Sequence, residues 1–142
     1  MQVLWPLPGA HLVGPGDGSA ANDASVVLLV EVAGVRLLLT GDVEPEAQAA
    51  LARAWPGLRA DVLKVPHHGS RYQDVDLLSG LGAGLALVSA GEDNDYGHPA
   101  PETLAALSTA GAEVLRTDVD GDLAVVVRDG ELEAVTSEAG GS

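Results

Sequence analysis

The sequence predicts a mixed α/β fold in which helices cover a β-sheet. Short runs of β-branched and aliphatic residues alternate along the chain with segments of helix formers, and this alternation is typical of α/β architectures. The polar motifs TGD, HHGS and YGHP each lie in the loop that comes after an apolar run. Because ligand sites in such folds gather at the carboxyl ends of strands, the motifs indicate a shared site.

The size and charge of the chain limit the functions open to it. Its 142 residues suit one domain, and the core must be aliphatic because the chain has no Phe, two Trp and two Tyr. The chain has no Cys, so any metal must be held by His, Asp or Glu. The formal charge of -14 argues against a broad contact surface for DNA, so a nucleic-acid partner would need local help, such as metal ions.

We expect a soluble chain without a targeting segment. Each long apolar run is broken by a charge or a glycine well short of the roughly 18 to 20 residues that a membrane helix needs. No basic stretch precedes an apolar run at the start, so the first residues do not resemble a secretory signal.

The first half of the chain predicts a hairpin followed by a helix. Residues 1–24 are expected to be partly ordered, with a flexible Pro/Gly/Ser-rich connection over 6–21. Two apolar runs, 25–32 and 35–40, flank an Ala-Gly turn and predict a β-hairpin. A proline near its first position and a run of Ala, Leu and Arg predict a helix over 45–55.

The second half predicts alternating strands and helices and then further strands. Pro66 ends the first of these strands, and Gly111 stops the last helix after Pro101 begins it. Strands are predicted at 61–65, 85–91, 113–118, 122–129 and 131–137, helices at 75–81 and 100–111, and a disordered tail at 138–142.

Asp42 is the first candidate for chemistry, because it follows the apolar run LLLTG. Its carboxylate can emerge at the end of a strand, where Gly41 lets other groups approach closely. Aspartate in the context GDVEPE is also an ordinary helix cap, and the local sequence alone favours capping.

Two adjacent histidines, His67 and His68, follow another predicted strand. On extended backbone their side chains point to opposite sides, so we expect one to face a site and the other to stabilise the loop. A single histidine is more often a structural residue than a ligand, but a doubled pair beside Gly69 and Ser70 is harder to explain in that way. Ser70 is at most a backbone or phosphate contact, since sequence neighbours rarely form a nucleophile and base.

His98 and Asn22 are weaker candidates. Gly97 and Pro99 flank His98 and restrict its backbone, which could aim the imidazole, although the same residues also suit a simple turn. Asn22 lies before the first hairpin strand and could be part of a polar turn.

Taken in order, the motifs ANDASVVLLVEVAGVRLLLTGD, ADVLKVPHHGS, VSAGEDNDYGHP and GAEVLRTDVDGDLAVV resemble the C-terminal part of the metallo-β-lactamase-like domain of the ComEC competence proteins. That family is the DNA-uptake channel of naturally transformable bacteria, and the resemblance runs over residues 3–127. It implies a four-layer αβ/βα sandwich with a metal site at one edge, of which residues 25–137 would be the C-terminal half. HHGS and YGHP are shared with related phosphodiesterases.

The resemblance implies roles for the polar residues. Asp42 would bridge two divalent metal ions, zinc or manganese, and His98 and His67 would belong to the metal site. His67 or His68 would also act in catalysis together with Asp42.

Substrate-binding roles are expected for four further residues. Asn22 stands where many metallo-β-lactamases carry a histidine ligand. Lys64 and Arg71, on either side of the histidine pair, would supply local positive charge, and Ser70 would contact the phosphate.

The superfamily motif H-x-H-x-D-H, which supplies most of the metal ligands, is absent, and His11 stands alone. We therefore expect a fragment of a metal-dependent nuclease that degrades single- or double-stranded DNA during uptake, and expect it to bind metal weakly without the remainder of the same polypeptide. The parent would lie in the bacterial cell membrane with this domain outside the cytoplasm.

Alternatives to this function are a hydrolase of another phosphodiester, such as a phosphorylcholine ester, or a non-catalytic module. An exposed sheet face could also form a homodimer.

Overall fold

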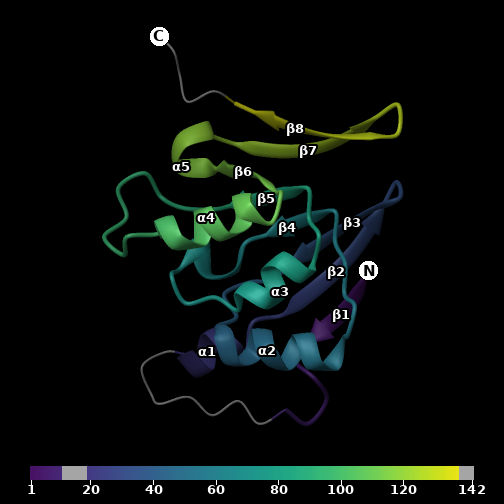
Figure 1. Ribbon diagram of the computed structural model, residues 1–142, viewed down its shortest axis with the longest axis vertical. Coiled ribbons are helices and arrows are strands. Elements are labelled where there is room, and N and C mark those ends of the chain that lie inside the picture. Colours follow the sequence, from purple (N-terminus) through teal and green to yellow (C-terminus); the bar gives the residue numbers. More distant parts are fainter. Residues whose placement is uncertain (11–18, 138–142) are drawn as a thin grey trace.

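The computed structural model describes residues 1–10 and 19–137. Within these ranges, six strands form one sheet in the order β1-β2-β3-β4-β5-β6, and β7 and β8 form a second sheet (Figure 1). The strands are β1 (Gln2–Trp5), β2 (Val27–Val32), β3 (Val35–Leu39), β4 (Val62–Lys64), β5 (Leu85–Val88), β6 (Glu113–Arg116), β7 (Leu123–Arg128) and β8 (Glu131–Thr136). The helices are α1 (Ser19–Asp23), α2 (Pro45–Ala54), the 3-10 helix η1 (Pro66–Gly69), α3 (Val75–Gly80), α4 (Pro101–Thr109) and α5 (Thr117–Asp120).

The mixed α/β class predicted from the sequence is confirmed. β2 and β3 pair antiparallel across the turn at Ala33 and Gly34, whose φ values of 51° and 80° suit a tight two-residue hairpin. β3, β4, β5 and β6 are mutually parallel, and α2, α3 and α4 connect them in turn. The carboxyl ends of β3 to β6 therefore lie at one edge of the sheet.

The core lies between this sheet and helices α2, α3 and α4, which cover the face turned toward the viewer in Figure 1. Because side chains alternate along a strand, Leu38, Leu63 and Ala86 face this helical layer in register across β3, β4 and β5. All three are fully buried, as are Leu51 of α2 and Leu107 of α4. The core is aliphatic, as the composition predicts.

The opposite face of the sheet keeps aliphatic side chains at its β2–β3 end. Leu28, Val30, Leu37 and Leu39 alternate with the core residues and are half-buried or exposed. Leu39 retains 38% of its exposure. An apolar surface of this kind is suited to cover by another layer.

Two parts of the N-terminal segment form regular structure among the described residues. β1 pairs with β2 at the edge of the sheet, and α1 begins at Ser19, inside the range predicted to be a flexible connection. The physical reason is tertiary: the Trp5 indole donates a hydrogen bond to the Asp23 carbonyl at 2.6 Å, and the Trp55 indole donates to the Leu4 carbonyl at 3.0 Å. The predicted tail and His11 lie outside the described residues.

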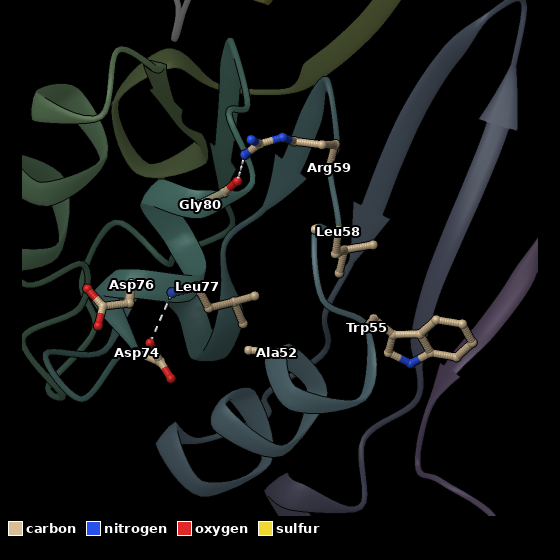
Figure 2. A pocket seen from close by; sticks show the side chains of 9 residues that line it. Ala52, Trp55, Leu58, Arg59, Asp74, Asp76, Leu77 and Gly80 are labelled. Carbon is tan, nitrogen blue, oxygen red and sulfur yellow. Dashed lines mark hydrogen bonds between the residues drawn. The ribbon is translucent and has the colours of Figure 1, made fainter.

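A pocket of about 350 Å³ opens on the helical side, where the end of α2 faces α3. Figure 2 shows Leu77 on one of its walls and Leu58 and Trp55 on the other. At its rim Asp74 caps α3 by accepting a hydrogen bond from the Leu77 amide at 3.0 Å. The candidate site residues do not line this pocket. No helix among residues 1–10 and 19–137 is long and apolar enough to span a membrane.

Gln48 is a fully buried polar residue that ties α2 to the start of α3. Its amide nitrogen donates to the Val43 carbonyl at 2.7 Å and to Gln73 Oε1 at 2.9 Å, and its amide oxygen accepts from the Asp74 backbone at 2.7 Å. No local pattern predicts this network, because it depends on contacts between segments that are distant in the sequence.

Replacing Gln48 with leucine should lower the free energy of unfolding by about 1–3 kcal/mol, the cost of leaving buried polar groups without partners. Urea denaturation measures the change. Arg53→Leu introduces the same side chain at an exposed position of α2 and should change stability by less than about 0.5 kcal/mol. Equal effects of the two substitutions would contradict the assigned network.

Candidate functional site

The polar motifs predicted from the sequence meet at the carboxyl edge of the parallel strands. Asp42 follows β3, His67 and His68 follow β4, and His98 lies in the loop that follows β5. The His67 ring lies 5.5 Å from the His98 ring and 6.3 Å from the His68 ring, measured between centroids. Three imidazoles from two loops therefore form one cluster.

The backbone of the histidine pair is left-handed, so the prediction of extended backbone with rings on opposite sides is wrong. His67 and His68 have φ values of 46° and 53°, and Gly69 continues the turn at 78°. The His67 amide donates to the Gly41 carbonyl at 3.2 Å, which ties the turn to the end of β3. In this coiled conformation both imidazoles reach carboxylates, one each.

Gly69 holds the histidine turn against the loop that carries His98. A side-chain carbon at this position would lie 2.7 Å from Pro99 Cβ and 3.2 Å from Pro99 Cα, so the contact requires glycine. The Ala100 amide also donates to the Gly69 carbonyl at 2.8 Å. The two histidine-bearing loops are thereby fixed relative to each other.

His68 is oriented through a backbone carbonyl. Its Nδ1 lies 2.7 Å from the Ser89 carbonyl oxygen, which can only accept, so Nδ1 carries the proton. Nε2 then lies 3.6 Å from Asp42 Oδ1. A histidine that donates one ring N–H to a carbonyl and turns its other nitrogen toward a carboxylate has the orientation of a metal ligand.

Asp42 is not the cap of α2, contrary to what its local sequence favours. The residue at the N-cap is Glu44, whose side chain makes no capping hydrogen bond. The Asp42 carboxylate instead lies 3.8 Å from Lys64 Nζ, which also donates to the Gly41 carbonyl at 3.2 Å. Burial lowers the pKa of Lys64, and the charge of Asp42 opposes that shift.

Glu44 is a site residue that the sequence reasoning missed. Its Oε1 lies 3.6 Å from His67 Nδ1 and accepts a hydrogen bond from Asn22 Nδ2 at 2.8 Å. The Glu44 amide donates to Asp23 Oδ1 at 2.8 Å, and burial together with the charges of Glu44 and Glu46 raises the pKa of Asp23. Asn22 therefore contacts the cluster through Glu44.

His98 is placed by its own loop. The Asn94 side chain makes two hydrogen bonds to the backbone of His98. Its Nδ2 donates to the His98 carbonyl at 2.7 Å, and its Oδ1 accepts from the His98 backbone amide at 3.1 Å. Burial lowers the pKa of His98, and the charges of His67, His68 and Arg71 lower it further.

The two remaining candidates, Ser70 and Arg71, differ in exposure. Ser70 is 2% exposed, its hydroxyl accepts from the Tyr72 amide at 3.2 Å, and its carbonyl accepts from Thr103 Oγ1 at 2.7 Å. Arg71 is exposed and its charge reaches His98. Between these two, the freely accessible group is the guanidinium.

The donor groups form two pairs, His68 with Asp42 and His67 with Glu44. Among the residues that the structure describes, no three His, Asp or Glu side chains converge in a geometry that could hold a metal ion. Each pair offers chemically suitable ligands for zinc or manganese. On these residues alone, such a site is incomplete.

The fold and this edge define an α/β protein with a cluster of histidines and carboxylates at the ends of parallel strands. Comparison with curated proteins finds bacterial competence proteins. The chain is 37% identical over 116 residues to ComE operon protein 3 of Bacillus subtilis, a match that covers 80% of the chain and 15% of that protein. It is 32% identical over 115 residues to competence protein ComA of Neisseria gonorrhoeae, covering 80% of the chain and 17% of that protein.

Recombination protein 2 of Haemophilus influenzae is 33% identical over 115 residues, covering 80% of the chain and 14% of that protein. No protein-family model matches the chain. The chain belongs to the ComEC family of competence proteins, as the order of its motifs predicts, and matches one segment of it. It spans only 14% to 17% of the length of these relatives.

Gly69→Ala should destabilise the protein more than Gly57→Ala. Both glycines have a φ of 78°, so both alanines pay about 1–2 kcal/mol for left-handed backbone, but Gly57 has no atom within 4 Å of the added carbon. The clash with Pro99 should add about 1–3 kcal/mol at Gly69. Urea denaturation of both variants measures the difference, and equal losses would contradict the close contact.

His98 should titrate below the ordinary histidine pKa of about 6.5. Because the folded-state pKa of His98 is lowered, the unfolded chain binds a proton at this residue first as pH falls below about 6.5. The free energy of unfolding therefore decreases between about pH 6.5 and the folded-state pKa of His98. Arg71→Gln and His67→Gln should each raise the pKa of His98 in metal-free solution, as followed by NMR. Arg128→Gln, on the β7–β8 hairpin, should leave it unchanged. A His98 pKa above 6.5 would contradict the described environment.

Proposed function

We propose that this chain is the C-terminal part of a metal-dependent phosphodiesterase domain that hydrolyses DNA during uptake. The observation that carries the proposal is the pair of His68 and Asp42, in which Nδ1 is held by the Ser89 carbonyl and Nε2 faces the carboxylate at 3.6 Å. Membership of the ComEC family of competence proteins supports it, and one of the relatives is itself named a competence protein.

Asp42 and His68 would be the first metal ligands on this chain, with His67 and His98 beside them. His68 Nε2 lies 3.6 Å from Asp42 Oδ1, so these two residues would hold one ion between them. Zinc or manganese bound there would polarise the phosphate and supply a hydroxide nucleophile. The missing ligands would come from an H-x-H-x-D-H segment in the remainder of the same polypeptide.

The chain's own residues would hold the substrate and orient the ligands. Lys64 beside Asp42 and the exposed Arg71 provide positive charge next to the cluster. Ser89 orients His68 through its carbonyl, and Asn22 holds Glu44 toward His67. These contacts would fix the ligands before metal binds, which reduces the ordering cost of binding.

The aliphatic face at the β2–β3 end supports the sandwich as the parent fold. Leu28, Val30, Leu37 and Leu39 lie on the face opposite the helices and keep solvent exposure. In a four-layer sandwich the second sheet would cover them and carry the missing ligands to the same edge. The occupant would then be another part of the same polypeptide.

In a polypeptide in which an H-x-H-x-D-H segment precedes this chain, manganese or zinc should support DNA cleavage. Asp42→Asn and His68→Gln should each reduce the cleavage rate by about tenfold to a hundredfold or more. Loss of a residue that only orients a metal ligand already has an effect of this size. Calorimetric titration with manganese should show weaker binding in both variants. Asp76→Asn, an exposed change on α3, is the matched control.

Full activity of Asp42→Asn, or cleavage that persists after chelation of metal, would overturn the proposal. Hydrolysis of phosphorylcholine esters without hydrolysis of DNA would favour the other phosphodiester substrate. Absence of both metal binding and cleavage would favour a non-catalytic module.

A further inference from the structure

A pocket of about 200 Å³ opens beside the histidine cluster. Its lining comes from the histidine turn and the loop after β5, namely His68, Ala90, Gly91, Asn94, Tyr96 and His98. His68 belongs both to this pocket and to the pair with Asp42. A group bound here would therefore lie next to whatever binds at the metal and phosphate site.

Tyr96 offers this pocket an open aromatic face. Its ring is stacked on His98, with centroids 6.1 Å apart and 23° between planes, and the residue is 84% exposed. One face of the tyrosine is thus occupied by His98, and most of the ring meets solvent. A flat aromatic ligand could extend this stack without moving the protein.

The polar group of Asn94 is already committed inside the loop. Its amide nitrogen donates to the Gly91 and His98 carbonyls at 2.9 and 2.7 Å, and its oxygen accepts from the His98 amide at 3.1 Å. The Asn94 amide therefore has little capacity left to read the edge of a base. Ala90 and Gly91 offer only small, non-specific contacts.

Because the protein is strongly acidic, its charge does not attract the phosphates of DNA strongly. The chain carries a net charge of -14. Lys64 and Arg71 supply positive charge near the cluster. A strand held here must gain most of its short-range affinity from another source. Stacking of bases on aromatic side chains supplies such affinity and tolerates every base, because each has a π-face.

We propose that an unpaired base of the DNA strand stacks on Tyr96 in this pocket while the adjacent phosphate lies at the His68–Asp42 pair. The inference rests on the proposed function and narrows its substrate to single-stranded DNA bound with little base preference. Tyr96 is a substrate-binding residue in this arrangement, and His98 supports its ring from behind.

The test is binding of a fluorescent oligonucleotide of about eight thymidines to the full chain at physiological ionic strength, which screens the repulsion between the acidic protein and the strand, followed by anisotropy. An abasic oligonucleotide of equal length and charge should bind at least about fivefold more weakly, and Tyr96→Ala should weaken thymidine binding by a similar factor. Tyr96→Phe and Tyr96→Trp should retain it, since both keep the aromatic face. Tyr72→Ala, at the other exposed tyrosine, is the matched control and should change nothing.

Equal binding of the thymidine and abasic strands, wild-type affinity of Tyr96→Ala, or no detectable binding would overturn the inference. Tighter binding of a duplex than of either single strand would also overturn it. NMR spectra of Tyr96→Ala, read at His98, show whether the loop keeps its structure, and the phenylalanine and tryptophan variants test stacking independently. The cleavage assay above is a separate measurement, so binding without cleavage would remove the proposed hydrolysis and leave the stacking site.

Discussion

The close approach of Gly69 to Pro99 is the contact on which the rest of the histidine cluster depends. With no side chain at Gly69, the turn after β4 and the loop after β5 meet at van der Waals distance, and the Ala100 amide bonds to the Gly69 carbonyl. The same two loops are joined again through His68 and the Ser89 carbonyl. One missing side chain thus lets imidazoles that are thirty residues apart in the sequence share one edge.

The carboxylates at this edge are matched one to one with imidazoles. His68 faces Asp42, and His67 faces Glu44, each at 3.6 Å. Because His68 donates its Nδ1–H to the Ser89 carbonyl, Nε2 of the neutral ring and Asp42 Oδ1 both present lone pairs, and a cation between them stabilises this pair. A proton or a metal ion can fill that role. The arrangement is therefore one that attracts cations before any further ligand arrives.

Local signals predicted most of the fold and the location of the cluster, but not its inner geometry. The Ala-Gly turn and the prolines at the starts of α2 and α4 act within a few residues, so the sequence alone identifies their elements. The left-handed backbone of His67 and His68 is imposed by contacts of the turn with β3 and with Pro99, which are distant in sequence. The role of Glu44 beside His67 was not predicted for a related reason, because its acidic sequence context indicates only the start of a helix.

The acidity of the chain constrains how a strand of DNA could reach this edge. With a charge of -14, the protein repels a polyanion at distances up to the Debye length, about 8 Å at physiological ionic strength. Only contacts of shorter range, such as stacking on Tyr96 or bridging by metal, can then favour binding. Under the proposed function, delivery of the strand would depend on other parts of the same polypeptide, which raise its effective concentration at the site. An acidic surface is compatible with such delivery, because it would repel any strand that no other part of the polypeptide holds in place.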